Sequence, residues 1–196
     1  MTRIGIIRHA RTQWNNEGRI QGRSDSPVTP QGLASARFWA ATLEPFGFSA
    51  LYSSPLGRAM ATSRALGREL GLEPRPLPGV EEQDFGEWTG RKVADLREEG
   101  LLSLQEALGW AFTPPGGESR AQLLARSWDA LLRLARSNQD QPVLVVAHEG
   151  VVRALVYALL GRDYLPWEPR ILAPRALHVL EAREGCLRLA EWNVPL

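Results

Sequence analysis

The chain has 196 residues and a net charge of +1, with 44% hydrophobic and 23% charged residues. This length allows a single domain with a sizeable core, and the balanced charge gives no support for a nucleic-acid or membrane partner. The only cysteine, Cys186, excludes an intrachain disulfide and fits a reducing cytoplasm. The apolar run before Arg8 is too short for a signal peptide, and no run reaches the roughly 18 residues of a membrane span.

The first predicted element is a short buried strand over residues 3–7, which are mostly apolar. Thr29 and Pro30 predict the start of a helix, because threonine caps free N–H groups and proline fits the first helical position. This helix extends to Glu44, and the side chains expected to face the core are Leu33, Ala36, Phe38, Ala40 and Leu43. The next predicted elements are a strand at 50–53, a helix at 54–71 and a short strand at 75–77.

The second half of the chain contains the strongest predicted strand, VLVVA at 143–147. It is continuously apolar and rich in β-branched residues, as expected of a strand buried on both faces. Ser119 caps a long amphipathic helix before it, in which the apolar positions are Leu123, Leu124, Trp128, Leu131, Leu132 and Ala135. The last predicted elements are a helix at 149–160 and a hairpin of strands at 177–181 and 187–192.

Strand and helix alternate through most of the chain, which predicts a three-layer α/β/α fold around a mainly parallel sheet. The least regular part is 91–118, where residues 93–99 are typical of a helix and 113–117 form a loop. No repeat, low-complexity tract or long linker is present. We therefore predict a single domain over residues 1–196 with an irregular region at 91–118.

Two of the three histidines occupy equivalent places in this pattern. His9 follows the first strand after Arg8, and His148 directly follows the strand at 143–147. Ligands of open α/β sheets bind outside the carboxyl ends of the strands, so both imidazoles are expected in one crevice. A single histidine at a strand end is more often structural than catalytic. Two at the same edge, one beside an arginine, favour a catalytic site.

Arg58 adds a third element to this constellation. It lies in the first turn of the predicted helix at 54–71, just after a strand. An arginine in such a position usually lies on a helix surface that is exposed to solvent. A helix N-terminus, however, favours anions through its free N–H groups and its dipole. Arg58 at this edge of the sheet therefore predicts a phosphate ligand.

The segment RHARTQWN at 8–15 resembles the RHG(E)T-x-x-N signature of the histidine phosphatase superfamily, which includes phosphoglycerate mutases, fructose-2,6-bisphosphatases and α-ribazole phosphatases. The resemblance covers nearly the whole chain in order and continues at residues 21–22, 25–32, 53–59, 82–90, 115–119 and 145–153. It implies a phosphoglycerate mutase-like fold. Two positions depart from the signature: Ala10 replaces its glycine and Arg11 its glutamate. Either change could tune substrate choice or weaken activity, and Ala10 requires a negative φ.

Phosphoryl transfer requires charge neutralisation, which Arg8 and Arg58 can provide by binding nonbridging phosphate oxygens without a metal. His9 can then attack phosphorus as a neutral imidazole, kept neutral by the neighbouring arginines, to give a phosphohistidine. The resemblance implies that His148 donates to the phosphoryl group. It also implies a phosphate cradle, and the residues assigned to substrate binding are Asn15, Gln21, Gly22 and the backbone N–H of Glu149.

The leaving alkoxide needs a proton, and the register of the motif at 82–90 assigns this role to Glu82. Glu81 and Glu87 are adjacent competitors. Arginines lower the pKa of Glu82, whereas burial and a substrate dianion raise it. We therefore expect Glu82 to be protonated mainly in the substrate complex.

These residues predict a metal-independent phosphatase, without a cofactor, that acts on a small phosphorylated metabolite. A phosphoglycerate mutase is the first alternative, but only about 28 residues separate Gly90 from Ser119, and mutases usually carry a longer insertion here. A catalytically weak phospho-ligand binding module is the second, supported only by Ala10 and Arg11. Specificity is expected within 91–118. The natural substrate and the oligomeric state are left open, a homodimer included.

Several other features have ordinary interpretations. His178 lies in an apolar strand and is expected to pack or to sit at an edge. Cys186 in the hairpin is expected to be inert. The aromatic side chains that could line a substrate entrance, but are more often core, are Trp14, Trp88, Trp110 and Phe112.

Overall fold

The computed structural model describes residues 1–196 and has one six-stranded sheet in the order β3-β2-β4-β1-β5-β6. The strands are β1 (Thr2–Arg8), β2 (Ala50–Ser53), β3 (Pro74–Pro76), β4 (Val143–Ala147), β5 (Ala176–Arg183) and β6 (Cys186–Pro195). The first four are parallel to one another, and only β5 and β6 run antiparallel to their neighbours. The predicted mainly parallel α/β fold is therefore confirmed.

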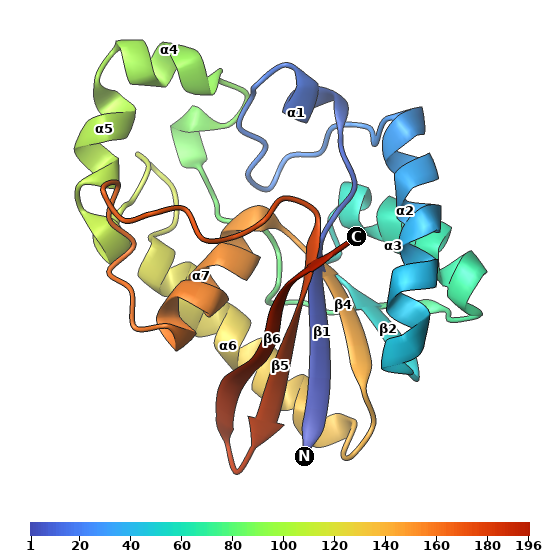
Figure 1. Cartoon of the computed structure of the whole chain (residues 1–196). Coiled ribbons are helices and arrows are strands. Elements are labelled where there is room, and N and C mark those ends of the chain that lie inside the picture. The colour runs from blue at the N-terminus through green and yellow to red at the C-terminus, as the bar shows by residue number, and fades with distance from the viewer.

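Helices cover both faces of this sheet (Figure 1). α2 (Pro30–Leu43) and α3 (Gly57–Leu70) pack against each other on one face, and α6 (Arg120–Ser137) and α7 (Glu149–Leu159) pack on the other. The caps agree with the sequence, because Thr29 Oγ1 accepts from Gly32 N and Ser119 Oγ accepts from Gln122 N. None of the helices combines the length and apolar character required to span a bilayer.

Two cores result from the alternation of side chains along the central strands. Ile4 and Ile6 of β1 lie in the core under α6 and α7, whereas Ile7 lies in the core under α2 and α3. β4 divides in the same way, with Val145 on one side and Val146 on the other. All five side chains are fully buried, and each contributes about 1.5–3 kcal/mol by leaving water. This explains why both strands are continuously apolar in sequence.

Apart from the sheet and its two helical layers, a group of short elements lies at the end of the sheet toward which β1 runs (Figure 1). These elements are α1 (Gln13–Asn16), η2 (Gly86–Trp88), α4 (Val93–Glu98), α5 (Leu101–Glu106) and η3 (Gly109–Ala111). η2, α4 and α5 contribute Trp88, Leu96 and Leu102 to a small core, which Ile20 and Phe112 complete. The sequence predicted α4 but missed α1 and α5, since helices of four to six residues show too few turns of apolar periodicity to be found dependably.

Some sequence predictions were wrong in detail. Phe38 of α2 is 80% exposed, and Trp39 is buried instead, because Trp39 lies on the stripe shared by Ala36 and Leu43. α3 begins at Gly57 and not at residue 54, since the backbone up to Leu56 is extended. In α6, three of the predicted apolar residues, Leu124, Trp128 and Leu132, pack against the core while remaining half-buried.

Candidate active site

His9 directly continues β1, and its backbone N–H donates to Ala147 O of the neighbouring β4 at 2.9 Å. The side chain is 5% exposed. Its Nδ1 lies 2.7 Å from Ala10 O, and a carbonyl oxygen only accepts, so Nδ1 carries the proton. Nε2 therefore keeps its lone pair and accepts from Arg58 Nε at 3.2 Å. The structure thus holds a neutral imidazole in one tautomer.

His148 follows β4 and precedes α7, and its ring centroid lies 5.2 Å from that of His9. The prediction that the two histidines lie close together is therefore confirmed. They do so because β1 and β4 are adjacent parallel strands in which Arg8 pairs with Ala147. His148 Nε2 lies 2.7 Å from Ser54 Oγ, which also accepts from Leu56 N at 3.3 Å. The Ser54 hydroxyl proton is free to donate to Nε2, which leaves Nδ1 protonated. That Nδ1 is buried and has no protein partner.

Burial lowers the pKa of both His9 and His148 well below the ordinary value of 6.5, and the charges of Arg8 and Arg58 add to the effect. The sequence predicted the direction for His9 and attributed it to the arginines. Burial is the larger cause, because His9 is only 5% exposed and His148 is fully buried.

Arg58 is 2% exposed and lies in the first turn of α3, as predicted. Its Nη2 donates to Gly22 O at 2.7 Å and its Nη1 to Ser24 O at 2.6 Å. The expected free N–H groups at this helix N-terminus are not free. The carboxylate of Asp25 accepts from Gly57 N at 2.6 Å and from Arg58 N at 3.1 Å. Arg58 Nη1 also donates to Asp25 Oδ1, so one N–H of Nη2 is the only donor of Arg58 that has no partner to give up before it meets a phosphate.

Arg8 lines the same cleft, but its guanidinium also forms an ion pair with the Glu149 carboxylate. Both side chains are partly exposed, at 40% and 59%. The sequence assigned Arg8 to phosphate and considered only the backbone N–H of Glu149. An incoming anion must therefore compete with an internal carboxylate for Arg8, which the sequence could not indicate because 141 residues separate the pair.

Glu82 lies on the loop before η2, and its carboxylate accepts from Gln83 N at 2.9 Å and from Gly150 N of α7 at 3.1 Å. A Cβ added at Gly150 would lie 2.2 Å from Glu82 Oε1, so glycine is what permits this approach. Burial raises the pKa of Glu82 above its ordinary 4.5, against the opposing effect of these hydrogen bonds and of Arg58. The shift is present without substrate, whereas the sequence prediction attributed protonation mainly to the substrate complex.

The two competing glutamates are placed elsewhere. Glu81 accepts from Gly79 N at 2.8 Å and lies 3.6 Å from Arg126, and Glu87 is exposed on η2. Neither lines the cleft that contains His9, whereas Glu82 does.

Sequence reasoning missed the residues that hold the Glu82 loop. Arg126 of α6 donates to the carbonyl oxygens of Glu81 and Glu82 at 2.9 and 3.0 Å, and it forms two hydrogen bonds with the Glu118 carboxylate at 2.6 and 2.8 Å. Glu118 in turn accepts from Asp84 N at 3.3 Å. The sequence placed Glu118 beside a helix cap. Its position in the matched motif at 115–119 was the only signal of a further role.

The remaining predicted binding residues surround the same cleft. Asn15 Oδ1 accepts from Thr12 N at 3.0 Å as part of a capping box, so its Nδ2 is the side-chain donor left over. Gln21 lines the cleft with its Oε1 buried and unpaired. Gly22 has a φ of +55° and presents its carbonyl to Arg58. Ala10, the departure from the signature, is buried and does not have a positive φ.

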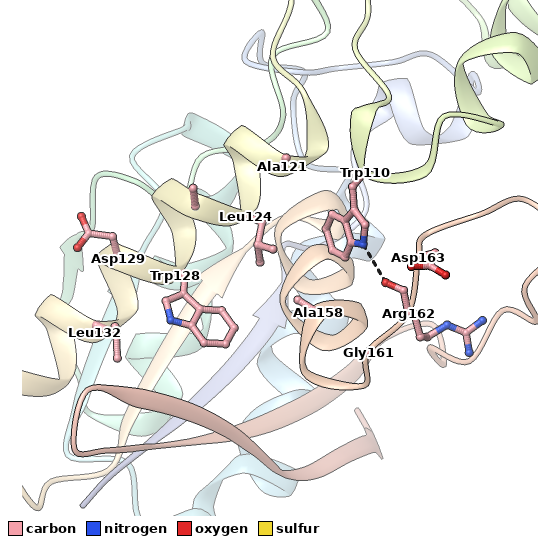
Figure 2. Close-up of a pocket in the computed structure, with 11 residues that line it drawn as sticks. Trp110, Ala121, Leu124, Trp128, Asp129, Leu132, Ala158, Gly161, Arg162 and Asp163 are labelled. Atoms are coloured by element: carbon pink, nitrogen blue, oxygen red, sulfur yellow. Dashed lines mark hydrogen bonds between the residues drawn. The ribbon is translucent and has the colours of Figure 1, made fainter.

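Two cavities meet at His9 and share Arg8, His9 and Asn15. One, of about 310 Å³, contains Glu82, and the other, of about 520 Å³, contains Arg11 and Arg175. A larger hollow of about 750 Å³ lies apart from the site, over α6 and α7, and Figure 2 shows Leu124 and Trp128 facing it. Nothing in its lining resembles catalytic chemistry.

The other residues singled out in the sequence lie outside the histidine pair. His178 is buried in β5, and burial lowers its pKa to about 4. Cys186 is an exposed free thiol. Phe112 lines the cleft, Trp88 packs in the small core and Trp110 lies at the hollow over α6. No group of three or more His, Cys, Asp or Glu side chains is arranged to hold a metal ion.

The fold, with its mainly parallel sheet between two helical layers, is that of the phosphoglycerate mutase-like proteins, and the two histidines, Arg58 and Glu82 lie together at one end of it. The family model for the histidine phosphatase superfamily (branch 1) matches residues 4–195. The chain belongs to this superfamily.

Individual relatives agree with this assignment. A metal-independent phosphoserine phosphatase of Arabidopsis thaliana is 34% identical over 79% of this chain and 67% of its own. A probable phosphoglycerate mutase of Escherichia fergusonii is 32% identical over 89% of this chain and 81% of its own. A mycobacterial glucosyl-3-phosphoglycerate phosphatase, solved with VO3, superposes with a TM-score of 0.83 at 31% identity and covers 98% of each chain.

Proposed function

We propose that the protein is a metal-independent phosphatase that hydrolyses small phosphate monoesters through a phosphohistidine at His9. The observation that carries the proposal is the hydrogen bonding of His9, because the Ala10 carbonyl fixes the proton on Nδ1 and leaves the Nε2 lone pair beside Arg58. A neutral imidazole with a fixed tautomer is the nucleophile that attack on phosphorus requires. The relative described as a metal-independent phosphatase supports the same chemistry.

In the first step, the hydrogen bond from Arg58 Nε to His9 Nε2 breaks, Nε2 forms a bond to phosphorus with the freed lone pair, and the ester P–O bond breaks. Arg58 and Arg8 neutralise the nonbridging oxygens, and His148 Nδ1, which has no protein partner, donates to one of them. Glu82 gives its proton to the departing oxygen. Its raised pKa supports this role, because a general acid must hold a proton before transfer.

In the second step, water attacks phosphorus, the N–P bond breaks and phosphate is released. Glu82, now ionised, accepts the proton of the water. Asn15 Nδ2 and the backbone N–H of Glu149 complete the phosphate cradle, and Gln21 contacts the substrate from the cleft wall. Gly22 acts through Arg58, whose guanidinium its carbonyl holds at 2.7 Å.

The substrate is a small phosphorylated metabolite, which the named activities of the phosphatase relatives support. The probable mutase among the relatives keeps phosphoglycerate mutase activity as a second candidate. The short segment between Gly90 and Ser119 favours water as the acceptor. The binding-module alternative depended on Ala10 and Arg11, and Ala10 fits the site with a negative φ.

The test is hydrolysis of p-nitrophenyl phosphate in EDTA by the wild type and by His9→Ala. We expect activity to survive EDTA and to be lost in the variant. An acid-labile, alkali-stable phosphoenzyme should form only in the wild type. Loss of activity in EDTA, or a phosphoenzyme in His9→Ala, would contradict the proposal. Faster interconversion of 2- and 3-phosphoglycerate than phosphate release would favour the mutase.

We also infer that residues 1–196 act as one domain, since a single sheet and its two cores include strands from both ends of the chain. We infer that the protein functions in a reducing cytoplasm, which its one free thiol, Cys186, supports. Light scattering of the purified protein would decide between a monomer and a homodimer.

A further inference from the structure

The loop that carries Glu82 has no regular secondary structure, so its position depends on contacts with other segments. Residues 77–85 connect β3 to η2, and within them Val80 is fully buried in the core under α6 and α7. A proton donor must lie close to the oxygen that it protonates, since a misplacement of about 1 Å can lower a rate about 100-fold. The residues that fix this loop therefore bear on catalysis without touching a substrate.

Arg126 of α6 holds the part of the loop that leads up to the carboxyl group. Its Nη1 donates to Gly79 O at 3.0 Å and to Glu81 O at 2.9 Å, and its Nη2 donates to Glu82 O at 3.0 Å. Ser127 Oγ also donates to Gly79 O, at 3.2 Å. One planar guanidinium thus fixes three backbone carbonyl groups within four residues.

Glu118 holds both Arg126 and the other side of the loop. Its two carboxylate oxygens accept from Arg126 Nε at 2.6 Å and from Arg126 Nη2 at 2.8 Å. Its backbone N–H donates to Asp84 O at 2.9 Å, and its carbonyl oxygen accepts from Gln83 Nε2 at 2.7 Å. The pair of Arg126 and Glu118 therefore contacts the chain on both sides of the Glu82 side chain.

These hydrogen bonds use all five N–H groups of Arg126. Arg126 does not line the cleft, and it has no donor left for a substrate or for the Glu82 carboxylate. That carboxylate accepts only from the backbone N–H groups of Gln83 and Gly150. Arg126 thus acts on Glu82 through the backbone, and its own charge is paired with Glu118.

We propose that Arg126, held by Glu118, is a positioning residue that keeps the Glu82 carboxyl group at the departing oxygen during proton transfer. This inference rests on the proposed phosphatase function and adds a residue to it. None of the hydrogen bonds of Arg126 reaches a residue proposed to bind phosphate. Loss of Arg126 should therefore slow the step that needs a proton and spare the binding of the phosphate group.

The test compares glycerol 3-phosphate, whose departing oxygen needs a proton, with p-nitrophenyl phosphate, whose p-nitrophenolate leaves without one. Arg126→Met keeps the aliphatic stem but donates no hydrogen bond. In this variant kcat for glycerol 3-phosphate should fall about 10- to 100-fold, with little change in KM. The burst of p-nitrophenolate, which measures the first step, should slow far less.

Two milder variants grade the effect. Arg126→Lys should restore part of the lost kcat, since an ammonium group can donate to some of the three carbonyl oxygens but lacks the planar fork. Glu118→Gln should lower kcat less than Arg126→Met, because an amide oxygen still accepts a hydrogen bond from Arg126. Arg126→Met combined with Glu118→Gln leaves no unpaired carboxylate at residue 118, so it tests the same change of preference in a protein without that buried charge.

The matched control is Arg162→Met. Arg162 and its partner Glu168 are 17% and 19% exposed, close to the 21% and 12% of Arg126 and Glu118, and Arg162 lies at the hollow apart from the site. Arg162→Met should lose stability and keep the ratio of the two rates.

Two results would overturn the inference. One is an equal loss for both substrates in Arg126→Met, as expected if Arg126 acted only through stability or through His148, whose pKa its charge lowers. The other is an equal change of the ratio in Arg162→Met. In either case, p-nitrophenyl phosphate hydrolysis that depends on His9 would still uphold the phosphatase. Absence of that hydrolysis in the wild type would instead overturn the proposed function.

Discussion

Two helix N-termini flank His9, and each receives a carboxylate from another part of the chain. At α3, Asp25 accepts from Gly57 N and Arg58 N. At α7, Glu82 accepts from Gly150 N. The interaction is the same in both places, since backbone N–H groups at a helix start attract an anion.

The surroundings of the two carboxylates differ. The Asp25 side chain is 42% exposed and lies 3.1 Å from Arg58 Nη1, so water and an ion pair both stabilise its charge. Glu82 has no ion pair, and burial raises its pKa. The comparison indicates that the same contact produces a structural cap where the carboxylate is solvated and a proton carrier where it is buried. The predictions below test that division.

Glu82→Gln should have the largest effect. Glutamine keeps the shape but cannot donate a proton, so kcat for glycerol 3-phosphate should fall about 10²- to 10⁴-fold. Hydrolysis of p-nitrophenyl phosphate should fall much less in its first step, because p-nitrophenolate leaves without a proton. Steady-state assays of both substrates, with burst kinetics for the first step, check this. Equal losses of the first step for both substrates would contradict the role of Glu82.

Gly150→Ala should have the next largest effect. The new Cβ would lie 2.2 Å from Glu82 Oε1 and displace the carboxylate, lowering kcat for glycerol 3-phosphate about 10- to 100-fold. The matched control is Gly57→Ala at α3, where the new Cβ would lie 2.9 Å from Asp25 Oδ2. That variant should lose some stability but keep the preference between the two substrates. If the preference between glycerol 3-phosphate and p-nitrophenyl phosphate changed in Gly57→Ala and not in Gly150→Ala, the roles assigned to Asp25 and Glu82 would be contradicted.

The pH profile should separate the two carboxylates. A general acid must be protonated, so kcat/KM for glycerol 3-phosphate should fall about tenfold per pH unit once the pH rises above the raised pKa of Glu82. This basic limb should disappear in Glu82→Gln and persist in Asp25→Asn. On the acidic side, the lowered pKa of His9 should keep its imidazole neutral below pH 6.5. An NMR titration in which the His9 ring gained a proton at or above pH 6.5 would contradict the hydrogen-bond assignment.

Asp25→Asn should have the smallest effect on catalysis and a clear one on stability. It weakens the cap of α3 and leaves the buried Arg58 without its ion pair, so the free energy of unfolding should fall by about 1–2 kcal/mol. KM should rise several-fold as Arg58 loses its fixed position, whereas the pH profile should not change. Urea unfolding and steady-state kinetics measure the two effects. A loss of kcat as large as that of Glu82→Gln would show that the two carboxylates are not distinct.

Much of the fold could be predicted because its central strands are locally unambiguous. The runs IGII and VLVVA are apolar throughout, as expected of strands that are covered on both faces. Thr29 and Ser119 cap helices that cover these strands. Phe38 was misplaced because one residue along a helix turns the side chain by about 100°. The small helix α5 depends on the shared core around Leu96 and Phe112, which local sequence does not reveal.

The sequence by itself determined the reactive groups. It placed His9 and His148 after the carboxyl ends of two strands and Arg58 in a first helical turn, since strand and helix periodicity are local properties of the chain. Only the tertiary structure decided their chemical state. Arg58 of α3 donates to Nε2 of His9 and so leaves the ring proton on Nδ1, Asp25 occupies the helix end expected to hold phosphate, and burial raises the pKa of Glu82. Desolvation and long-range hydrogen bonds depend on which distant segments meet, and no local pattern encodes that meeting.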